Sequence, residues 1–359
     1  MKAIGIILAG GNNNRMKELT AKRAVPALPV AGSFRSIDFA LSSMSNSHIQ
    51  TVAVLTQYNA RSLNEHLSSS KWWNFGRKQG GLFLFTPTVT ADNSDWYRGT
   101  ADAMYQNIDF LKRRHEPYVI ISSGDCVYKL DFNRVLDFHI EKKSDITVVC
   151  KDMMYNDDVS RFGVVRMDDE SRITEFDEKP IEALSNTIST GIYVIRRRQL
   201  IELLEAAAEE NRFDFVNDIL VRYKNVKKIY GYKINSYWNN IADIDAYFKT
   251  NMDFLRPDVR SYFFREEPTI CSKVDDLPPA KFNPGSDISN SLVSSGCIIN
   301  GSVEDSVLFK QVFVGKNTTV KNCVILNDVY IGDNVHLENC IVESRGTINP
   351  NTCYCGEDG

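Results

Sequence analysis

The chain lacks a long hydrophobic run and regularly paired cysteines. No apolar stretch among its 359 residues approaches the roughly 20 residues of a membrane span. The apolar segment from Met1 to Gly11 is too short for a secretory signal and predicts a buried strand that runs into a glycine turn. The eight cysteines show no metal-site spacing, and the closest pair, Cys353 and Cys355, is too sparse for zinc. We therefore expect free thiols in a reducing, cytoplasmic setting.

A strong excess of one charge is also missing. The chain has 42 basic and 46 acidic residues, a formal net charge of −4. This balance argues against a broad nucleic-acid or anionic-membrane surface, so we expect neither kind of partner. Hydrophobic residues make up 43% and charged residues 25%, values typical of a globular protein with a substantial core. The length suggests two domains, one of them large.

Short apolar runs alternate with amphipathic segments over residues 1–255. This alternation predicts an α/β domain with a doubly wound, mostly parallel, Rossmann-like sheet. In such sheets ligands bind at the carboxyl ends of the strands, where both Gly10-Gly11 and Gly124-Asp125 are expected. The predicted strands are Ile4–Leu8, Thr51–Leu55, Tyr118–Ser122, Asp145–Cys150 and Gly191–Ile195, and the predicted helices are Thr100–Arg113, Phe132–Lys142, Arg198–Glu209, Phe215–Tyr223 and Asp243–Leu255.

A different pattern follows a proline-rich linker at residues 256–286. Over residues 287–359 an aliphatic residue recurs about every five to six positions, with Asn, Ser, Gly and Asp between. This spacing predicts a left-handed parallel β-helix of roughly three coils. A small antiparallel β-sandwich is the rival interpretation. The flat faces of a β-helix would make this domain a natural subunit interface.

Four segments have residues suited to phosphate or metal chemistry. Gly10 and Gly11 could bring backbone N–H groups to phosphates, with Arg15 adding positive charge. Asp125 follows a buried strand, as a Mg²⁺ ligand would. The turn at Gly99 and Thr100 could contact a base or phosphate, and Lys179, beside Pro180, could hold a sugar phosphate. Taken singly, an ordinary turn, helix start, strand-end cap or exposed charged loop would explain each segment equally well or better.

Together these segments resemble the ADP-glucose pyrophosphorylase (glucose-1-phosphate adenylyltransferase) family of bacterial glycogen synthesis. The resemblance covers essentially the whole chain, including the β-helix. Its most specific stretches are 35–42 (RSIDFALS), 56–58 (TQY), 96–103 (WYRGTADA), 124–125 (GD), 128–129 (YK), 162–164 (FGV), 178–180 (EKP), 191–193 (GIY), 277–282 (LPPAKF) and 291–293 (SLV).

The resemblance implies a reaction and residue roles. The family joins ATP and glucose-1-phosphate, releasing ADP-glucose and pyrophosphate, by aligning the substrates and neutralising charge. Asp125 would bind Mg²⁺ and act with Arg15 as a catalytic, here vestigial, pair. By the same resemblance, Gly10, Gly11 and Arg15 would hold the ATP phosphates, Gly99 and Thr100 would lie against the adenine, and Glu178, Lys179, Ser189 and Asp214 would line the sugar-phosphate site.

The departures from the family pattern cluster where that reaction happens. The second metal aspartate is replaced by Asn240, and a phosphate-facing lysine is replaced by Val25. Further exchanges place Asn13 and Asn14 in the glycine loop, Ser33 at a lysine linked to activator binding, Cys126 at a histidine after the catalytic Asp, and Val216 and Asn217 within the Asp-Phe-Gly-Lys-Asp motif. Losing one charge-stabilising contact typically costs about 10²–10³-fold in rate.

This combination resembles a GlgD-type subunit, which accompanies a catalytic GlgC-type partner in a hetero-oligomer. The resemblance implies a regulatory subunit with little activity and with Mg²⁺ bound weakly or not at all. Two alternatives remain: an active adenylyltransferase, supported by the retained sugar-site residues, and a sensor of ATP, glucose-1-phosphate or a sugar-phosphate effector. Asp243 could replace the missing metal ligand, although a helix N-cap explains it without a metal.

Overall fold

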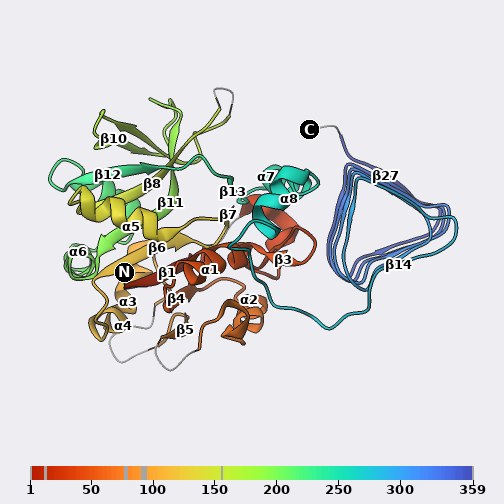
Figure 1. The fold of residues 1–359 in the computed structure, drawn as a ribbon, viewed down its shortest axis with the longest axis horizontal. Coiled ribbons are helices and arrows are strands. Elements are labelled where there is room, and N and C mark those ends of the chain that lie inside the picture. The colour runs from red at the N-terminus through yellow and green to blue at the C-terminus, as the bar shows by residue number, and fades with distance from the viewer. Residues whose placement is uncertain (1, 12–13, 77–79, 90–94, 155–156, 358–359) are drawn as a thin grey trace.

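The computed structural model describes residues 2–11, 14–76, 80–89, 95–154 and 157–357. They form an α/β domain and a stack of short strands that appears as a triangle in end-on view (Figure 1). Within the described residues, no helix is both long and apolar enough to cross a membrane.

A nine-stranded mixed sheet forms the centre of the first domain. Its main path runs β10-β9-β11-β6-β1-β4-β5, and β8 pairs with both β11 and β12. The β5-β4-β1-β6 portion is parallel, whereas β11 runs antiparallel to its neighbours. All five predicted strands are confirmed. The bounds are β1 Ala3–Ala9, β4 Thr51–Thr56, β5 Gly81–Phe85, β6 Tyr118–Ser123, β8 Ile146–Asp152, β9 Gly163–Met167, β10 Ile173–Glu178, β11 Thr187–Arg196 and β12 Ile229–Lys233.

Helices cover both faces of this sheet. One apolar core includes α1, α2 and α5, and another includes α3, α4 and α6. The predicted helix over 100–113 is interrupted at Asn107, whose side chain donates a hydrogen bond to the Ala103 carbonyl at 2.9 Å. The predicted helix over 215–223 contains a π-helical segment, Val216–Val221. The α-helices are α1 Ser36–Asn46, α2 Arg61–Leu67, α3 Thr100–Gln106, α4 Ile108–Lys112, α5 Phe132–Glu141, α6 Arg197–Glu209, α7 Ile244–Asp253 and α8 Pro257–Phe264.

Short elements surround the carboxyl edge of the sheet. Two small antiparallel sheets pair β2 (Pro29–Val30) with β3 (Phe34–Arg35), and β7 (Cys126–Tyr128) with β13 (Trp238–Asn240). Three 3₁₀ segments span Asn14–Thr20, Val25–Ala27 and Ser70–Trp73. The pairing of β7 with β13 joins segments more than 100 positions apart, and it brings Asn240 beside Cys126.

The connection between the domains is shorter than the predicted linker. Helix α8 lies within residues 256–286, and its Val259 and Phe263 share a core with Phe254, just after α7. Strand β14 (Lys281–Phe282) already pairs with β17 (Ile298–Ile299) of the second domain. The structure therefore leaves residues 265–280 as the connector.

The second domain is the predicted left-handed parallel β-helix. Its three sheets contain five, five and four strands, so the prediction of three coils was too low. Neighbouring coils repeat mostly at 17 residues, and asparagines stack at their corners: Asn317 donates to Asn334 at 3.2 Å, and Asn334 donates to Asn351 at 3.0 Å. All three have positive φ, a conformation that asparagine tolerates better than most residues.

The bounds of the β-helix strands follow in three sheets. The first holds β14, β17 Ile298–Ile299, β20 Phe313–Val314, β23 Tyr330–Ile331 and β26 Thr347–Ile348; the second holds β15 Asp287–Ser289, β18 Ser302–Glu304, β21 Thr319–Lys321, β24 His336–Glu338 and β27 Cys353–Cys355; the third holds β16 Leu292–Val293, β19 Val307–Leu308, β22 Val324–Ile325 and β25 Ile341–Val342.

The two domains share an apolar core. Phe309 and Leu326 from the β-helix belong to the same buried cluster as Phe39 and Phe254 from the first domain. An ion pair between Arg23 and Glu343 adds a charged contact across this boundary. The β-helix therefore packs directly on the segments that border the carboxyl edge of the sheet.

Candidate active site

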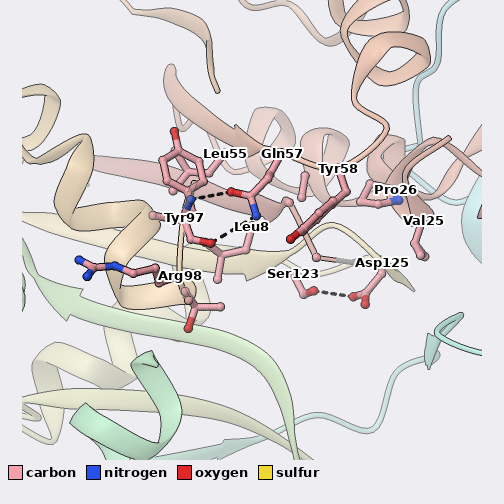
Figure 2. Close-up of a pocket in the computed structure, with 16 residues that line it drawn as sticks. Leu8, Val25, Pro26, Leu55, Gln57, Tyr58, Tyr97, Arg98, Ser123 and Asp125 are labelled. Atoms are coloured by element: carbon pink, nitrogen blue, oxygen red, sulfur yellow. Dashed lines mark hydrogen bonds between the residues drawn. The ribbon is translucent and has the colours of Figure 1, made fainter. Parts of the chain in front are cut away.

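Two pockets meet at the carboxyl ends of the parallel strands. The first has a volume of about 470 Å³ and is lined by residues that follow β1, β4 and β6, including Gly10, Gly11 and Gln57 (Figure 2). The second, of about 400 Å³, is lined by Arg15, Glu178 and other residues around β9, β10 and β11. Ser123 and Asp125 line both pockets, so we call the whole space the cleft.

The glycine turn after β1 borders the first pocket. A side chain at Gly10 would lie 3.2 Å from Cβ of Gln57, whereas one at Gly11 would meet no atom of the described residues within 4 Å. Close packing against Gln57 thus explains why position 10 is a glycine. Gly11 has space around it and leaves its backbone exposed to the cleft. Of the two loop substitutions, Asn13 lies outside the described residues, and Asn14 is exposed at the start of a 3₁₀ segment.

The Gly99 turn is held mainly by packing. A Cβ at Gly99 would lie only 2.4 Å from the Phe213 carbonyl oxygen, and the Arg98 guanidinium stacks 3.8 Å from the centre of the Phe213 ring. Both Gly99 and Thr100 still line the first pocket. The glycine therefore allows two backbones to approach, which places Thr100 at the pocket wall.

Gln57 and Tyr58 complete the first pocket, although the sequence did not single them out as site residues. The Gln57 amide accepts a hydrogen bond from the Tyr97 N–H at 2.7 Å and donates one to the Tyr97 carbonyl at 3.3 Å (Figure 2). Tyr58 stacks on Trp96 with ring centroids 5.8 Å apart. The stretch TQY was visible as a motif, but the partner of each side chain depends on the fold.

Asp125 presents a carboxylate at the junction of the two pockets. Ser123 Oγ donates a hydrogen bond of 2.5 Å to its Oδ1 (Figure 2). Across the β7–β13 pairing, the Ile241 N–H donates to the Asp125 carbonyl at 3.0 Å. This contact fixes the segment after Asn240 directly beside Asp125.

Asn240 lines the second pocket with a neutral amide. Its Oδ1 accepts the Ala242 N–H at 3.0 Å, and its Nδ2 donates to Cys126 Sγ at 3.4 Å. Burial and the nearby Asp125 raise the pKa of the Cys126 thiol well above its usual value, so this partner is also uncharged at neutral pH. The pair Asp125 and Asn240 does not fit a metal site made of two carboxylates.

The Asp243 side chain caps a helix and forms an ion pair. Its side chain accepts the Ala246 N–H at 2.8 Å, which makes it the N-cap of α7, and it forms an ion pair with Arg161. Arg161 itself lines the second pocket. The interpretation of Asp243 as a helix cap is confirmed.

Val25 borders the first pocket as part of a buried apolar turn. Its side chain is 5% exposed and belongs to the core that contains Met16 and Leu28. The preceding arginine, Arg23, pairs with Glu343 of the β-helix. Neither position therefore brings a lysine ammonium group into the pocket.

The second pocket keeps its charged residues. Glu178 ends β10, and Lys179, which follows in a left-handed conformation (φ 52°), places its Nζ 3.3 Å from Glu178 Oε1. Burial raises the pKa of Glu178, while the Lys179 charge opposes this shift. Ser189 is buried and donates to the Tyr193 hydroxyl at 3.3 Å. All four side chains line this pocket.

The family resemblance places Arg15 at the ATP phosphates and Asp214 in the sugar-phosphate site. Arg15 lines the second pocket and not the first. Asp214 lies outside the lining of both pockets, where Thr100 Oγ1 donates to it at 3.4 Å and the Asn217 N–H donates at 2.7 Å. Asp214 thus links the Thr100 turn to the π-helical segment that contains Asn217.

Ser33 lies apart from the cleft, in a pocket between the two domains. That pocket has a volume of about 470 Å³, and Arg35, Lys310 and Arg345 also line it. Burial lowers the pKa of Arg35, and Lys310 Nζ forms an ion pair with Asp275 at 2.8 Å.

Comparison with known proteins identifies both domains. Residues 4–256 match the family model described as nucleotidyl transferase, and residues 278–359 match the model described as GlmU-like, C-terminal hexapeptide. The chain is 39% identical over 360 residues to the glucose-1-phosphate adenylyltransferase of Geobacillus stearothermophilus, covering 99% of this chain and 93% of that protein. The proteins of the same description from Clostridium novyi and Bacillus subtilis are 38% and 37% identical, covering 88% and 89% of this chain and 84% of each relative.

Proposed function

Because the chain belongs to the glucose-1-phosphate adenylyltransferase family, we propose that it is a regulatory subunit that turns over little substrate itself and modulates a catalytic partner. The observation that carries the proposal is the neutral Asn240 in the pocket that Asp125 also lines. Its amide oxygen is used by the Ala242 N–H and its amide nitrogen by Cys126. A divalent cation between ATP and the protein would therefore meet one protein carboxylate in place of two.

Among the described residues, neither Asp243 nor Val25 replaces a lost charge. Asp243, the nearest candidate in sequence, is bound to Arg161 and to the first turn of α7. Val25 supplies no positive charge for a triphosphate. Magnesium would supply charge neutralisation of the phosphates if it bound, and we expect it to bind weakly here. Each lost contact removes typically about 10²–10³-fold in rate.

The second pocket, which we call the sugar-phosphate half of the cleft, supports a ligand-binding role. The first pocket is the nucleotide half. Lys179 and Arg15 provide positive charge for a phosphate, and Glu178 and Ser189 provide groups that could bond sugar hydroxyls. We propose that glucose-1-phosphate or a related sugar phosphate binds in this half. A ligand there could change the partner's affinity through a coupling free energy of typically about 1–3 kcal/mol.

The β-helix offers a surface for such a partner. On its first sheet Ile298, Phe313 and Tyr330 are in register on successive strands, and the rings of Phe313 and Tyr330 stack with centroids 4.9 Å apart. Ile298 and Tyr330 are 39% and 47% exposed. An apolar ladder of this kind is typical of an interaction site. We propose that it contacts a catalytic subunit of the same family in a hetero-oligomer.

The decisive experiment measures ADP-glucose formation by the purified chain alone, by a catalytic relative alone and by their mixture. We expect almost no ADP-glucose formation by the chain alone. In the mixture we expect the substrate affinity or turnover of the catalytic relative to change. Tyr330→Asp should weaken the effect on the partner, whereas Lys228→Asp, on an exposed residue of the first domain, should not. Robust turnover by the chain alone would reject the proposal.

A second function is supported by the retained sugar site. With Glu178, Lys179 and Ser189 in place, the chain could be an adenylyltransferase in its own right, using Asp125 and substrate phosphates for the cation. The two functions differ in how Asn240→Asp acts. Little change in an already active protein would favour the independent enzyme, and a large gain from a silent one would favour the regulatory subunit.

A further inference from the structure

The last two strands of the second β-helix sheet place four metal-ligating side chains on one outer face. In β24 and β27 the register sets His336 beside Cys353 and Glu338 beside Cys355. Because successive side chains alternate between faces, Leu337 points into the core and is 1% exposed. His336, Glu338, Cys353 and Cys355 therefore form a two-by-two array, which we call the coil cluster.

Distances within the coil cluster suit a shared cation. One ligand atom each from His336, Glu338 and Cys355 lies within 4.8 Å of the other two. Cys353 Sγ and Cys355 Sγ are 3.7 Å apart. Tetrahedral zinc with bonds to sulfur of about 2.3 Å holds its sulfur ligands about 3.8 Å apart. The thiol pair thus already has the spacing of two ligands on one zinc ion.

We propose that the coil cluster binds a thiophilic divalent cation of the zinc class. Two thiols and an imidazole favour such ions over Mg²⁺ or Ca²⁺, which prefer oxygen ligands. Glu338 supplies the oxygen: its Oε2 faces His336 Nε2 at 3.4 Å, while its Oε1 pairs with Lys321 Nζ at 3.2 Å. The carboxylate can therefore give one oxygen to the metal and keep its lysine partner.

The ligand set is confined to these two strands. In the earlier strands of the same sheet, the same two columns hold Asp287, Ser302 and Thr319, and Ser289, Glu304 and Lys321, none of which is a thiol or imidazole. The C-x-C pair looked too sparse for zinc because its partners lie 17 residues earlier in the sequence. The coil repeat brings them side by side, so the site is visible only in the folded chain.

A bound cation would cross-link two successive coils. His336 and Glu338 belong to one coil and both cysteines to the next, so the metal would fasten β27 to β24 beyond their backbone hydrogen bonds. The last coil gains most from such a link because Tyr354 in β27 is 52% exposed and contributes little to the core. We expect zinc to raise the thermal stability of this domain.

Cobalt substitution in the intact, reduced chain tests the proposal. Titration with Co²⁺ should saturate at one ion, with thiolate-to-cobalt charge transfer and the intense visible bands of tetrahedral coordination, and Zn²⁺ should displace it. Cys355→Ser and His336→Ala should abolish these bands. Cys271→Ser removes an exposed thiol elsewhere and should leave them unchanged.

Circular dichroism of each variant separates loss of the site from loss of the fold, and the exposed positions of both cysteines make folded variants the expected result. A thiol count before and after Zn²⁺ provides a second measurement: zinc should protect two thiols in the wild type and none in Cys353→Ser/Cys355→Ser. Absence of thiolate bands in the reduced wild type would overturn the proposal. So would a Cys353–Cys355 disulfide that persists in reductant, or bands that survive in Cys355→Ser.

Discussion

The two halves of the cleft meet at Asp125 but have kept different amounts of charge. The second pocket, the sugar-phosphate half, retains Arg15, Glu178 and Lys179 beside the neutral Asn240, whereas the first pocket, the nucleotide half, presents Val25. Both halves have the same strand-end architecture. On our proposal, the contrast teaches that a fold can preserve the shape of an active site, and binding in one part of it, after the charges needed for the chemical step have been replaced.

The largest expected effect comes from restoring the missing charges together. Asn240→Asp/Val25→Lys should raise ADP-glucose formation by at least about 10²-fold, because each change returns a charge that stabilises the transition state. Asn240→Asp alone should give a smaller gain. The measurement is steady-state turnover with ATP, glucose-1-phosphate and Mg²⁺.

Asn239→Asp is the matched control for this gain. It adds the same charge one position earlier, where the side chain donates to Thr250 Oγ1 at 2.7 Å and does not line the cleft. It should leave turnover unchanged. Equal activity of the double variant and the wild type would remove the contrast between the two halves.

The next effect concerns the half that kept its charges. Lys179→Ala should weaken glucose-1-phosphate binding by about 10-fold or more, since a hydrogen bond to a charged group contributes about 1.5–3 kcal/mol. Calorimetric titration measures it, and Lys228→Ala, at an exposed lysine outside the cleft, serves as the control. If the two variants bind equally well, the sugar half is as inactive as the nucleotide half.

A third prediction tests whether Asp243 is structural. Asp243→Ala should lower the free energy of unfolding by about 1–2 kcal/mol, because the variant loses the N-cap of α7. Asp131→Ala removes the N-cap of α5, far from the substituted residues of the cleft, and should cost a similar amount. A change in metal binding in Asp243→Ala alone, seen by Mn²⁺ titration, would mean that Asp243 does replace the missing ligand.

The smallest effect involves Glu178. Its pKa is raised by burial, so the folded state binds this proton more tightly than the unfolded state. Its contribution to stability is therefore fully present below the unfolded pKa and is lost as the pH rises through the folded pKa. Glu178→Gln should stabilise the fold at neutral pH by less than about 1 kcal/mol and flatten this pH dependence. Thermal unfolding across the acidic range measures it, and a destabilised Glu178→Gln would contradict the assignment.

The sequence predicted the parts of the fold that depend on local pattern. Continuous apolar runs predicted β1, β4 and β6, because strands covered on both faces have no polar alternation. Helix α1 escaped prediction because serines interrupt its apolar spacing; the structure shows that Ser42 and Ser43 are buried and bonded to other segments. The number of coils was underestimated because a coil takes only about 17 residues and because β14, at the start of the stack, lies within the predicted linker.

The sequence predicted which residues lie in the candidate site better than it predicted the contacts that each of them makes. Asp125, Asn240, Glu178 and Lys179 come together as the family resemblance implied. The bidentate contact of Gln57 with Tyr97 could not be predicted, since it joins residues 40 positions apart without a charge pattern. Asp214 was expected in the sugar site; it does not line the second pocket, but its charge raises the pKa of Glu178, and its role there stays a prediction.

The most direct test measures how strongly the cleft binds a divalent cation with nucleotide. Mn²⁺ is a paramagnetic substitute for Mg²⁺, and titration followed by electron paramagnetic resonance, with and without ATP, reports its binding. Our account predicts that the wild type adds little to the affinity of ATP itself for Mn²⁺, while Asn240→Asp forms a distinct protein-bound species. Tight binding of the Mn²⁺–ATP complex by the wild type, unchanged in Asn240→Asp, would contradict it.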